Sequence, residues 1–260
     1  MSPTARQVAD GVMEMMEGLG LTWSGGWTRR DTGCIAMVSG VEIASLNGVV
    51  VASEEFDDEV VGRALDEVAA TGLPYCLQVR PSCASDAAEF AARRSMTFEE
   101  YQVPLMVLDD PARLAPVAEI DSFVVRQLAP AEADLHSRVA AEGFGAPFEL
   151  FQRLATPSML SVEGVRCYVG ELDGAAVTTG MGFCSGSHVS IFSVATSPDH
   201  RGHGYGAALT AAAVTDGFAA GVEWAWLQSS PDGFSVYQRL GFRTVEEWSC
   251  WFSEGAASED

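Results

Sequence analysis

The hydrophobic pattern in the second half of the chain predicts short strands alternating with helices. Apolar runs typical of strands are separated by turn residues or by Ala-rich, helix-forming segments. The pair Asp173-Gly174 between two such runs is a strong hairpin signal. From about residue 121 we expect a mixed series of strands and helices. The expected strands are 122–126, 166–172, 175–183, 187–196, 223–228 and 243–252, and the expected helices open near 129 and cover 206–217 and 232–240.

The first half of the chain echoes the second. Residues 49–53 (VVVAS) resemble residues 192–196 (FSVAT). Three further matches follow in the same order, namely 62–65 with 206–209, 76–81 with 226–231, and 97–101 with 244–248. Such ordered matches predict two copies of one α/β unit, residues 1–117 and 118–260, joined by the Pro-containing segment 109–118.

The amino-acid composition and the net charge of the chain exclude some classes of function. The 260 residues are enough for two domains. They carry 36 acidic and 15 basic residues, every base is Arg, and the net charge is −21. Both halves are acidic, which excludes a basic face for nucleic acid. An acidic surface can attract a cationic substrate such as an amine, but a surface charge that only keeps the protein soluble is the more common explanation.

Targeting and redox signals are absent from the sequence pattern. No apolar run reaches the roughly 18 residues that a membrane span needs, and residues 1–7 lack the apolar stretch of a signal peptide. The six cysteines form no CxxC pair, so neither a disulfide framework nor a zinc knuckle is indicated. We therefore expect a cytoplasmic protein with no membrane partner and with cysteines that act as small hydrophobes.

A glycine-rich loop, residues 197–206 (SPDHRGHGYG), lies between an expected strand and an expected helix. Glycines let the backbone approach a ligand, and free N–H groups at a helix N-terminus bind anions. Arg201 adds a cation suited to phosphate. A Walker loop needs Lys-Ser/Thr, which is missing here, and the spacing differs from the GxGxxG dinucleotide fingerprint. The pattern predicts a pyrophosphate site.

The segment RGHGYG, residues 201–206, fits R-x-x-G-x-G and resembles the acyl-CoA loop of the GNAT superfamily of N-acetyltransferases. The strand end at 191–196 and the segment YQRLGF at 237–242, which fits Y-x-x-x-G-F, strengthen the resemblance over residues 122–252. It extends weakly over the rest, as in tandem (double) GNAT proteins with a degenerate N-terminal half. The resemblance implies an α/β (α+β) fold of two GNAT-like units, each a mixed, mostly antiparallel sheet flanked by helices.

The resemblance also implies roles for individual residues. Backbone groups of the strand end would hold the pantetheine arm of acetyl-CoA and stabilise an oxyanion, and loop N–H groups would bind its pyrophosphate. Ser230 stands where the family often has Asn, and Tyr237 would act as general acid toward the thiolate. The implied cofactor-binding residues are Val194, Ala195, Thr196, Arg201, Gly202, His203, Gly204, Tyr205, Gly206 and Ser230.

The general base is open. His188 is the best candidate by residue type and shares a strand face with Ser190, where some relatives carry Glu. An edge histidine without a catalytic role is the alternative, and Glu142, Glu149, Glu163 or a water relay remain as other bases. No metal is expected, because His200 and His203 lack a third ligand at suitable spacing. Trp226 either packs in the core or lines the acceptor pocket.

The first half has lost the loop. Residues 53–62 (SEEFDDEVVG) keep Gly62 but carry acids that would repel a pyrophosphate, so we expect no CoA there. This half would complete the fold, wall the acceptor pocket or mediate contacts in a homodimer. The expected function is transfer of an acetyl group from acetyl-CoA to an amine of a small molecule, amino acid or peptide by direct transfer. The alternative is a non-catalytic acyl-CoA-binding or regulatory module.

Overall fold

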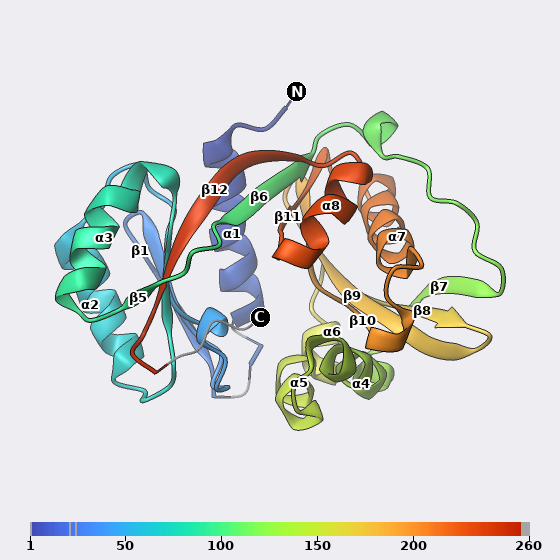
Figure 1. The fold of residues 1–260 in the computed structure, drawn as a ribbon, viewed down its shortest axis with the longest axis horizontal. Helices are drawn as coiled ribbons and strands as arrows, with labels where there is room; N and C mark the ends of the chain where they lie inside the picture. Colours follow the sequence, from blue (N-terminus) through green and yellow to red (C-terminus); the bar gives the residue numbers. More distant parts are fainter. Residues whose placement is uncertain (1, 21, 24, 256–260) are drawn as a thin grey trace. The chain divides into compact units, whose positions relative to one another are not determined.

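The computed structural model describes residues 2–20, 22–23 and 25–255 (Figure 1). These residues form two compact units. The N-terminal unit comprises Thr4–Leu105 and the described residues from Thr244 onward, and the C-terminal unit comprises Met106–Arg243 with Ser2 and Pro3. The boundary therefore falls inside the strands β6 (Val103–Leu108) and β12 (Arg243–Phe252).

The N-terminal unit contains a mixed sheet in the order β1-β2-β3-β4-β12, with the short β5 also on β12. The pair β3–β4 is parallel, and β1–β2, β2–β3 and β4–β12 are antiparallel. Figure 1 shows α2 and α3 on one side of this sheet and α1 on the other. The elements are β1 (Trp27–Asp31), β2 (Cys34–Val38), β3 (Asn47–Val51), β4 (Cys76–Val79), β5 (Thr97–Phe98), α1 (Ala5–Gly20), α2 (Asp58–Ala69) and α3 (Ala84–Arg93).

The C-terminal unit also contains a mixed, mostly antiparallel sheet, in the order β11-β10-β9-β8-β7. Only β10 and β11 pair in parallel among these strands. The predicted order of elements is confirmed, and α5 and α6 are additional helices between α4 and β8. The elements are β7 (Phe123–Gln127), β8 (Val165–Leu172), β9 (Ala175–Ser185), β10 (His188–Thr196), β11 (Trp224–Gln228), α4 (Ala133–Phe144), α5 (Phe148–Leu154), α6 (Pro157–Leu160), α7 (Tyr205–Ala219) and α8 (Pro231–Arg239).

The helices of the C-terminal unit cover both faces of its sheet (Figure 1). Gly217 of α7 lies against Val189 of β10, because a Cβ at Gly217 would be 2.7 Å from Val189 Cγ1. Gly143 of α4 lies against Ala195 of the same strand, because a Cβ at Gly143 would be 2.7 Å from Ala195 Cβ. Val189 and Ala195 thus face opposite helices. The α7 face carries a large apolar core, and α4 reaches the other face closely because Gly143 has no Cβ.

The last strand departs from the sequence-based prediction. Residues 243–252 were expected to close the sheet of the second half, but Ser249–Phe252 pair antiparallel with Cys76–Val79 of β4. In the C-terminal unit the strand order places β6, which comes from the first half, next to β11. The apolar pattern fixes that a segment is a strand but not which strand it pairs with. The division at residues 117 and 118 into functional domains stays a prediction.

The predicted fold class is confirmed, because both units are mixed, mostly antiparallel sheets flanked by helices. Within the part of the chain that the structure describes, no helix is both long and apolar enough to cross a membrane.

Candidate functional site

A β-bulge interrupts β10 near its C-terminal end. Phe192 pairs with Met181 and Ala195 with Thr179, so Ser193 and Val194 together stand opposite the single residue Gly180. Ser193 has φ +53°, a left-handed conformation that is unusual for a residue other than Gly. Gly180 makes room for the bulge, because a Cβ there would lie 3.1 Å from Val194 Cγ2 and 2.7 Å from Leu209 Cδ2. Bulges of this kind redirect side chains next to functional sites.

Beyond its first three residues, β10 also leaves its parallel neighbour. The pairing with β11 covers only His188–Ser190 against Trp224–Trp226. Among the described residues, the backbone N–H and C=O groups of 191–196 on the side of β11 have no strand partner. Backbone groups that become buried need hydrogen-bond partners. An extended ligand that carries amide groups fits such an edge in the manner of an added strand. Val194, Ala195 and Thr196, predicted to bind the pantetheine arm, all lie on this segment.

The predicted anion loop connects β10 to α7. Gly202 and Gly204 adopt φ +80° and +86°, which a side chain would strain. Gly204 is the N-cap of α7 and gives it no side-chain cap, and the intrahelical bond from Ala208 N reaches Gly204 O at 2.9 Å. The N–H groups of residues 205–207 thus precede the helical bonding pattern and carry the positive end of the helix dipole. This arrangement suits a phosphate.

Arg201 lies beside this loop but is tied to the end of α4. Its Nη2 donates to Gly143 O at 2.5 Å, and its Nε donates to Thr196 O at 3.4 Å. A second link runs from Ser197 Oγ to Glu142 Oε2 at 2.8 Å. Arg201 therefore anchors the loop to α4 in this structure, and direct contact with a phosphate stays a prediction.

The aromatic side chains of the loop hold its shape. The exposed His203 contacts Arg201 O through Nδ1 at 2.8 Å, and its ring stacks on Tyr205 at 5.8 Å. Tyr205 is buried, and its ring lies 4.6 Å from that of Phe123 on β7. Backbone groups of residues 202–206 remain for a ligand, while the side chains of His203 and Tyr205 support the start of α7.

Tyr237 and Ser230 both belong to the α8 region. Burial raises the pKa of Tyr237 to about 12, so its hydroxyl keeps its proton at neutral pH. Its ring packs edge-on against Phe242, and a Cβ at Gly233 would lie 2.7 Å from it. Ser230 is the N-cap of α8 and its Oγ accepts from Gly233 N at 3.3 Å. The role of Tyr237 as a general acid stays a prediction, and Ser230 caps the start of α8.

His188 is the first residue of β10 and is buried in the core. Its ring stacks on Trp224 at 4.7 Å, and burial lowers its pKa to about 4. The structure provides no hydrogen-bond partner for His188 Nε2, nor for the indole N–H of the buried Trp226, among its described residues. Ser193 at the bulge follows His188 by five positions along the strand, which is roughly 16 Å. The structure does not bring His188 to the bulge, and its role as base stays a prediction.

A second buried histidine, His136 of α4, was missed by the sequence analysis. Its Nδ1 lies 2.7 Å from Thr179 Oγ1, and its Nε2 lies 3.4 Å from Ser193 Oγ at the bulge. Burial alone lowers its pKa to about 4. The available signal was its place on the apolar face of the helix, three and four residues before Val139 and Ala140.

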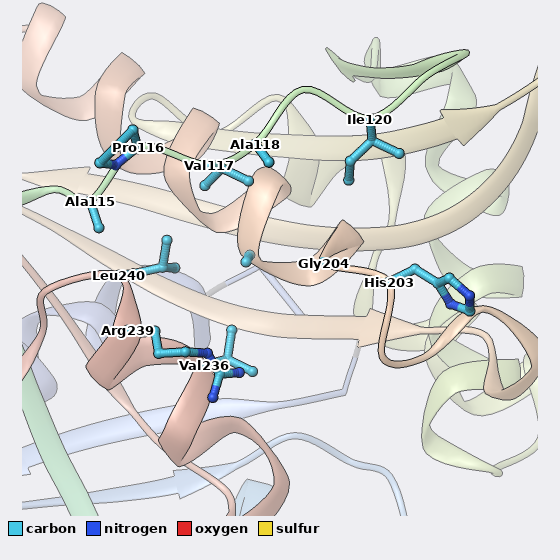
Figure 2. Close-up of a pocket in the computed structure, with 11 residues that line it drawn as sticks. Ala115, Pro116, Val117, Ala118, Ile120, His203, Gly204, Val236, Arg239 and Leu240 are labelled. Atoms are coloured by element: carbon cyan, nitrogen blue, oxygen red, sulfur yellow. The ribbon is translucent and has the colours of Figure 1, made fainter.

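A groove adjoins the loop on the α7 side (Figure 2). The cavity measures about 270 Å³ and is bordered by the segment 115–120, by the start of α7 and by α8. Its lining is mainly apolar, with His203 and Arg239 as the polar side chains. The groove lies directly beside Gly204, and it was not predicted from the sequence.

The corresponding helix in the N-terminal unit is α2, and the carboxylate of Asp57 caps its N-terminus. Asp57 Oδ1 accepts hydrogen bonds from Glu59 N and Val60 N, each at 3.0 Å, at the start of α2. The N–H groups that an anion would need are thus already used, and the acids add repulsion. This geometry favours the prediction that this half binds no CoA.

Comparisons with known proteins bear on both units. A family model described as an acetyltransferase (GNAT) domain matches residues 163–244. No curated protein sequence matches the chain. A GCN5-related N-acetyltransferase from Kribbella flavida has a similar structure, with TM-score 0.72, 18% identity, and coverage of 98% of this chain and 97% of that one.

Two further structures resemble the whole chain. A tandem GNAT protein from the clavulanic acid biosynthesis pathway gives TM-score 0.58 at 16% identity, covering 99% of this chain and 98% of that one. A GCN5-related N-acetyltransferase from Sphaerobacter thermophilus gives TM-score 0.61 at 16% identity, covering 94% and 84%. The C-terminal half of this chain therefore carries a GNAT acetyltransferase domain, in a chain whose two units have the fold of tandem GNAT proteins.

Proposed function

We propose that this protein transfers an acetyl group from acetyl-CoA directly to an amine of a small molecule, an amino acid or a peptide. The observation that carries the proposal is the combination of a bulged, unpaired strand end on β10 with an uncapped helix start on α7. Eight residues, 197–204, separate the end of β10 from the start of α7, and the two features suit the two polar parts of one ligand.

The residues present fit acetyl-CoA as the co-substrate. The free edge of Val194–Thr196 suits the amides of a pantetheine arm, and the N–H groups of residues 202–206 suit a pyrophosphate. A Cβ at Gly206 would lie 3.4 Å from Thr196 Oγ1, so the helix start approaches the strand closely. The groove beside Gly204 adds room and a cation, Arg239, for the nucleotide end. When bound, acetyl-CoA supplies an acyl group activated as a thioester.

Tyr237 supplies the proton for the departing thiolate in this proposal. A thiol has a pKa near 8.5 in solution, and the pKa of a phenol is higher, near 10. Burial raises the pKa of Tyr237 further, to about 12. The phenol is therefore fully protonated before transfer, and its proton moves only when negative charge develops on a nearby atom.

The partner on the acceptor side is an amine. The net charge of −21 favours approach of a cation and gives no basis for nucleic acid. None of the six cysteines, all of which lie in the described part of the chain, forms a disulfide, which accords with a reducing compartment such as the cytoplasm. The described residues hold no cluster of His, Cys, Asp or Glu suited to a metal ion, and the proposed reaction uses none. In this proposal the N-terminal unit mediates contacts in a homodimer.

A second candidate, a non-catalytic acyl-CoA-binding module, rests on one observation. Ser190, where some relatives carry a carboxylate base, is buried and its Oγ donates to Phe183 O at 3.3 Å. Such a module would bind acetyl-CoA without turning it over.

The test is calorimetric titration of acetyl-CoA followed by a thiol-release assay with a panel of primary amines. We expect one site per chain that is lost in Gly204→Glu, where a carboxylate would face the phosphate, and kept in Gly62→Ala of the N-terminal unit. Release of CoA that depends on an amine and falls in Tyr237→Phe would support the enzyme. Binding without release for every amine would favour the module, and the absence of binding would refute both.

A further inference from the structure

The tautomer of His136 follows from the hydrogen bonds around it. Thr179 Oγ1 donates its single proton to Tyr168 O at 2.8 Å. The 2.7 Å contact between Thr179 Oγ1 and His136 Nδ1 must therefore be donated by the imidazole. A neutral imidazole that carries its proton on Nδ1 has a free lone pair on Nε2. That lone pair is directed at the bulge.

Ser193 Oγ lies 3.4 Å from this Nε2 and is positioned to donate to it. His136 is 1% exposed and Thr179 is fully buried, whereas Ser193 is only partly buried. The serine hydroxyl thus connects a buried imidazole to the open side of the bulge. Thr179 also interacts with Cys167 on β8, whose thiol stays protonated because burial raises its pKa to about 12. Desolvation is the only cause of the shift at His136, so no charged group opposes or assists it.

The backbone at Ser193 is held in an unfavourable conformation. A φ of +53° is strained for a residue with a Cβ, and Gly would avoid most of that strain. The chain nevertheless has a serine here, and the strained conformation is the one in which its hydroxyl meets His136. A base, a hydroxyl and a group that orients the base form the arrangement by which proteins activate hydroxyl groups.

We propose that Ser193 and His136 form a proton relay that takes the proton of the acceptor amine during acyl transfer, with Thr179 as a positioning residue. The proposal rests on the proposed function. The amine nitrogen attacks the thioester carbonyl carbon, a C–N bond forms and the C–S bond breaks. The nitrogen loses one proton to Ser193 Oγ as Ser193 passes its own proton to His136 Nε2. The thiolate gains a proton from Tyr237, which is later restored from His136 through solvent, so that amide and thiol are the only products.

The low basicity of His136 is compatible with this task. Its pKa of about 4 keeps the imidazole neutral and ready to accept a proton at neutral pH. An amine nitrogen becomes a strong acid only after it has bonded to the carbonyl carbon, so a weak base suffices at that moment. Serine as a covalent nucleophile is the competing use of the same three groups, and the experiment separates the two.

The first readout is independent of turnover. Nitrogen-15 NMR of the histidine-labelled protein at neutral pH reports which ring nitrogen of each histidine carries a proton. We expect the Nδ1–H tautomer for His136, assigned by its loss in His136→Gln, and a shift of its Nε2 signal in Ser193→Gly. An Nε2–H tautomer or an imidazolium at neutral pH would overturn the relay.

The second readout is thiol release from acetyl-CoA alone, in which water replaces the amine, together with calorimetric affinity for acetyl-CoA. If the relay acts as the general base, kcat for thiol release should fall roughly 10²-fold or more in His136→Gln and in Ser193→Gly. The affinity for acetyl-CoA should be unchanged in both variants. The double variant should fall no further, because the two groups act as one. Ser193→Gly relieves the strained φ, so its folding is expected to be at least as stable as that of the wild type.

The outcomes are distinguishable. If acetyl-CoA does not bind the wild-type protein, the proposed function fails. If it binds and Ser193→Gly keeps the wild-type rate, the relay fails while the function stands. A rate lost in His188→Gln but kept in His136→Gln would assign the base to His188 instead. Acetyl-Ser193 detected by mass spectrometry after rapid quenching would replace the relay by a covalent mechanism.

Discussion

The stability of the C-terminal unit should fall as the pH is lowered from about 7 to about 5, and two buried histidines should cause much of this loss. His136 and His188 each have a pKa lowered from 6.5 to about 4 by burial. In the unfolded chain both are free to bind protons near pH 6.5, but in the folded protein they stay neutral until about pH 4. The unfolded state therefore binds more protons in this window, and acid favours it.

The magnitude follows from the two pKa values. Between about pH 7 and about pH 5, a histidine with these values destabilises the folded state by roughly 2 kcal/mol, so the pair contributes about 4 kcal/mol. This is a large share of the 5–15 kcal/mol that is typical of whole domains. The loss approaches its limit near pH 4, where the folded protein begins to protonate the same rings.

Urea unfolding, followed by circular dichroism and Trp fluorescence at about pH 7 and pH 5, measures the effect. His136→Gln and His188→Gln should each reduce the difference between the two pH values by roughly 2 kcal/mol, whatever they do to stability at pH 7. His203→Gln, at an exposed position of the same unit, is the matched control. An unchanged pH dependence in both buried-site variants would refute the reasoning, because carboxylates would then account for the whole effect.

Three further predictions concern the framework of the site. Gly241→Ala should destabilise the C-terminal unit by about 2 kcal/mol or more in urea unfolding, because Gly241 has φ +100° and a Cβ would lie 2.2 Å from Arg113 O; wild-type stability would contradict this. Asp57→Ala should cost about 1 kcal/mol through loss of the α2 cap and create no second acetyl-CoA site, as calorimetry would show. Arg201→Ala should weaken acetyl-CoA binding about tenfold by releasing the loop from Gly143, and an unchanged affinity would exclude that role.

The sequence predicted those features that depend on local pattern. The hairpin at Asp173-Gly174 forms as expected, with φ of +49° and +82° at the two turn residues. The loop before α7 was recognisable because Gly202 and Gly204 adopt positive φ angles that favour glycine. The Gly of the Y-x-x-x-G-F segment has the same kind of explanation, since Gly241 lets the carbonyl of Arg113 approach.

Features that depend on contacts between distant segments were not predictable. Residues 249–252 pair with β4, and their apolar alternation would have suited an edge of either sheet equally well. The contact of His136 with Ser193 joins residues 57 apart in the chain. The contact also requires the bulge opposite Gly180, which redirects the side chain of Ser193. In the sequence, Ser193 looks like an ordinary polar residue of an alternating strand. The sequence therefore indicated the glycine-rich loop before α7 but missed the contact of His136 with Ser193 beside the bulge.

The central claim is that the C-terminal unit holds acetyl-CoA between the β10 bulge and the start of α7. Calorimetric titration of acetyl-CoA into the wild type, Gly204→Glu and Gly62→Ala tests it most directly. The account predicts one site per chain for the wild type and Gly62→Ala, and none for Gly204→Glu. Absence of binding to the wild type, or equal binding to Gly204→Glu, would contradict it.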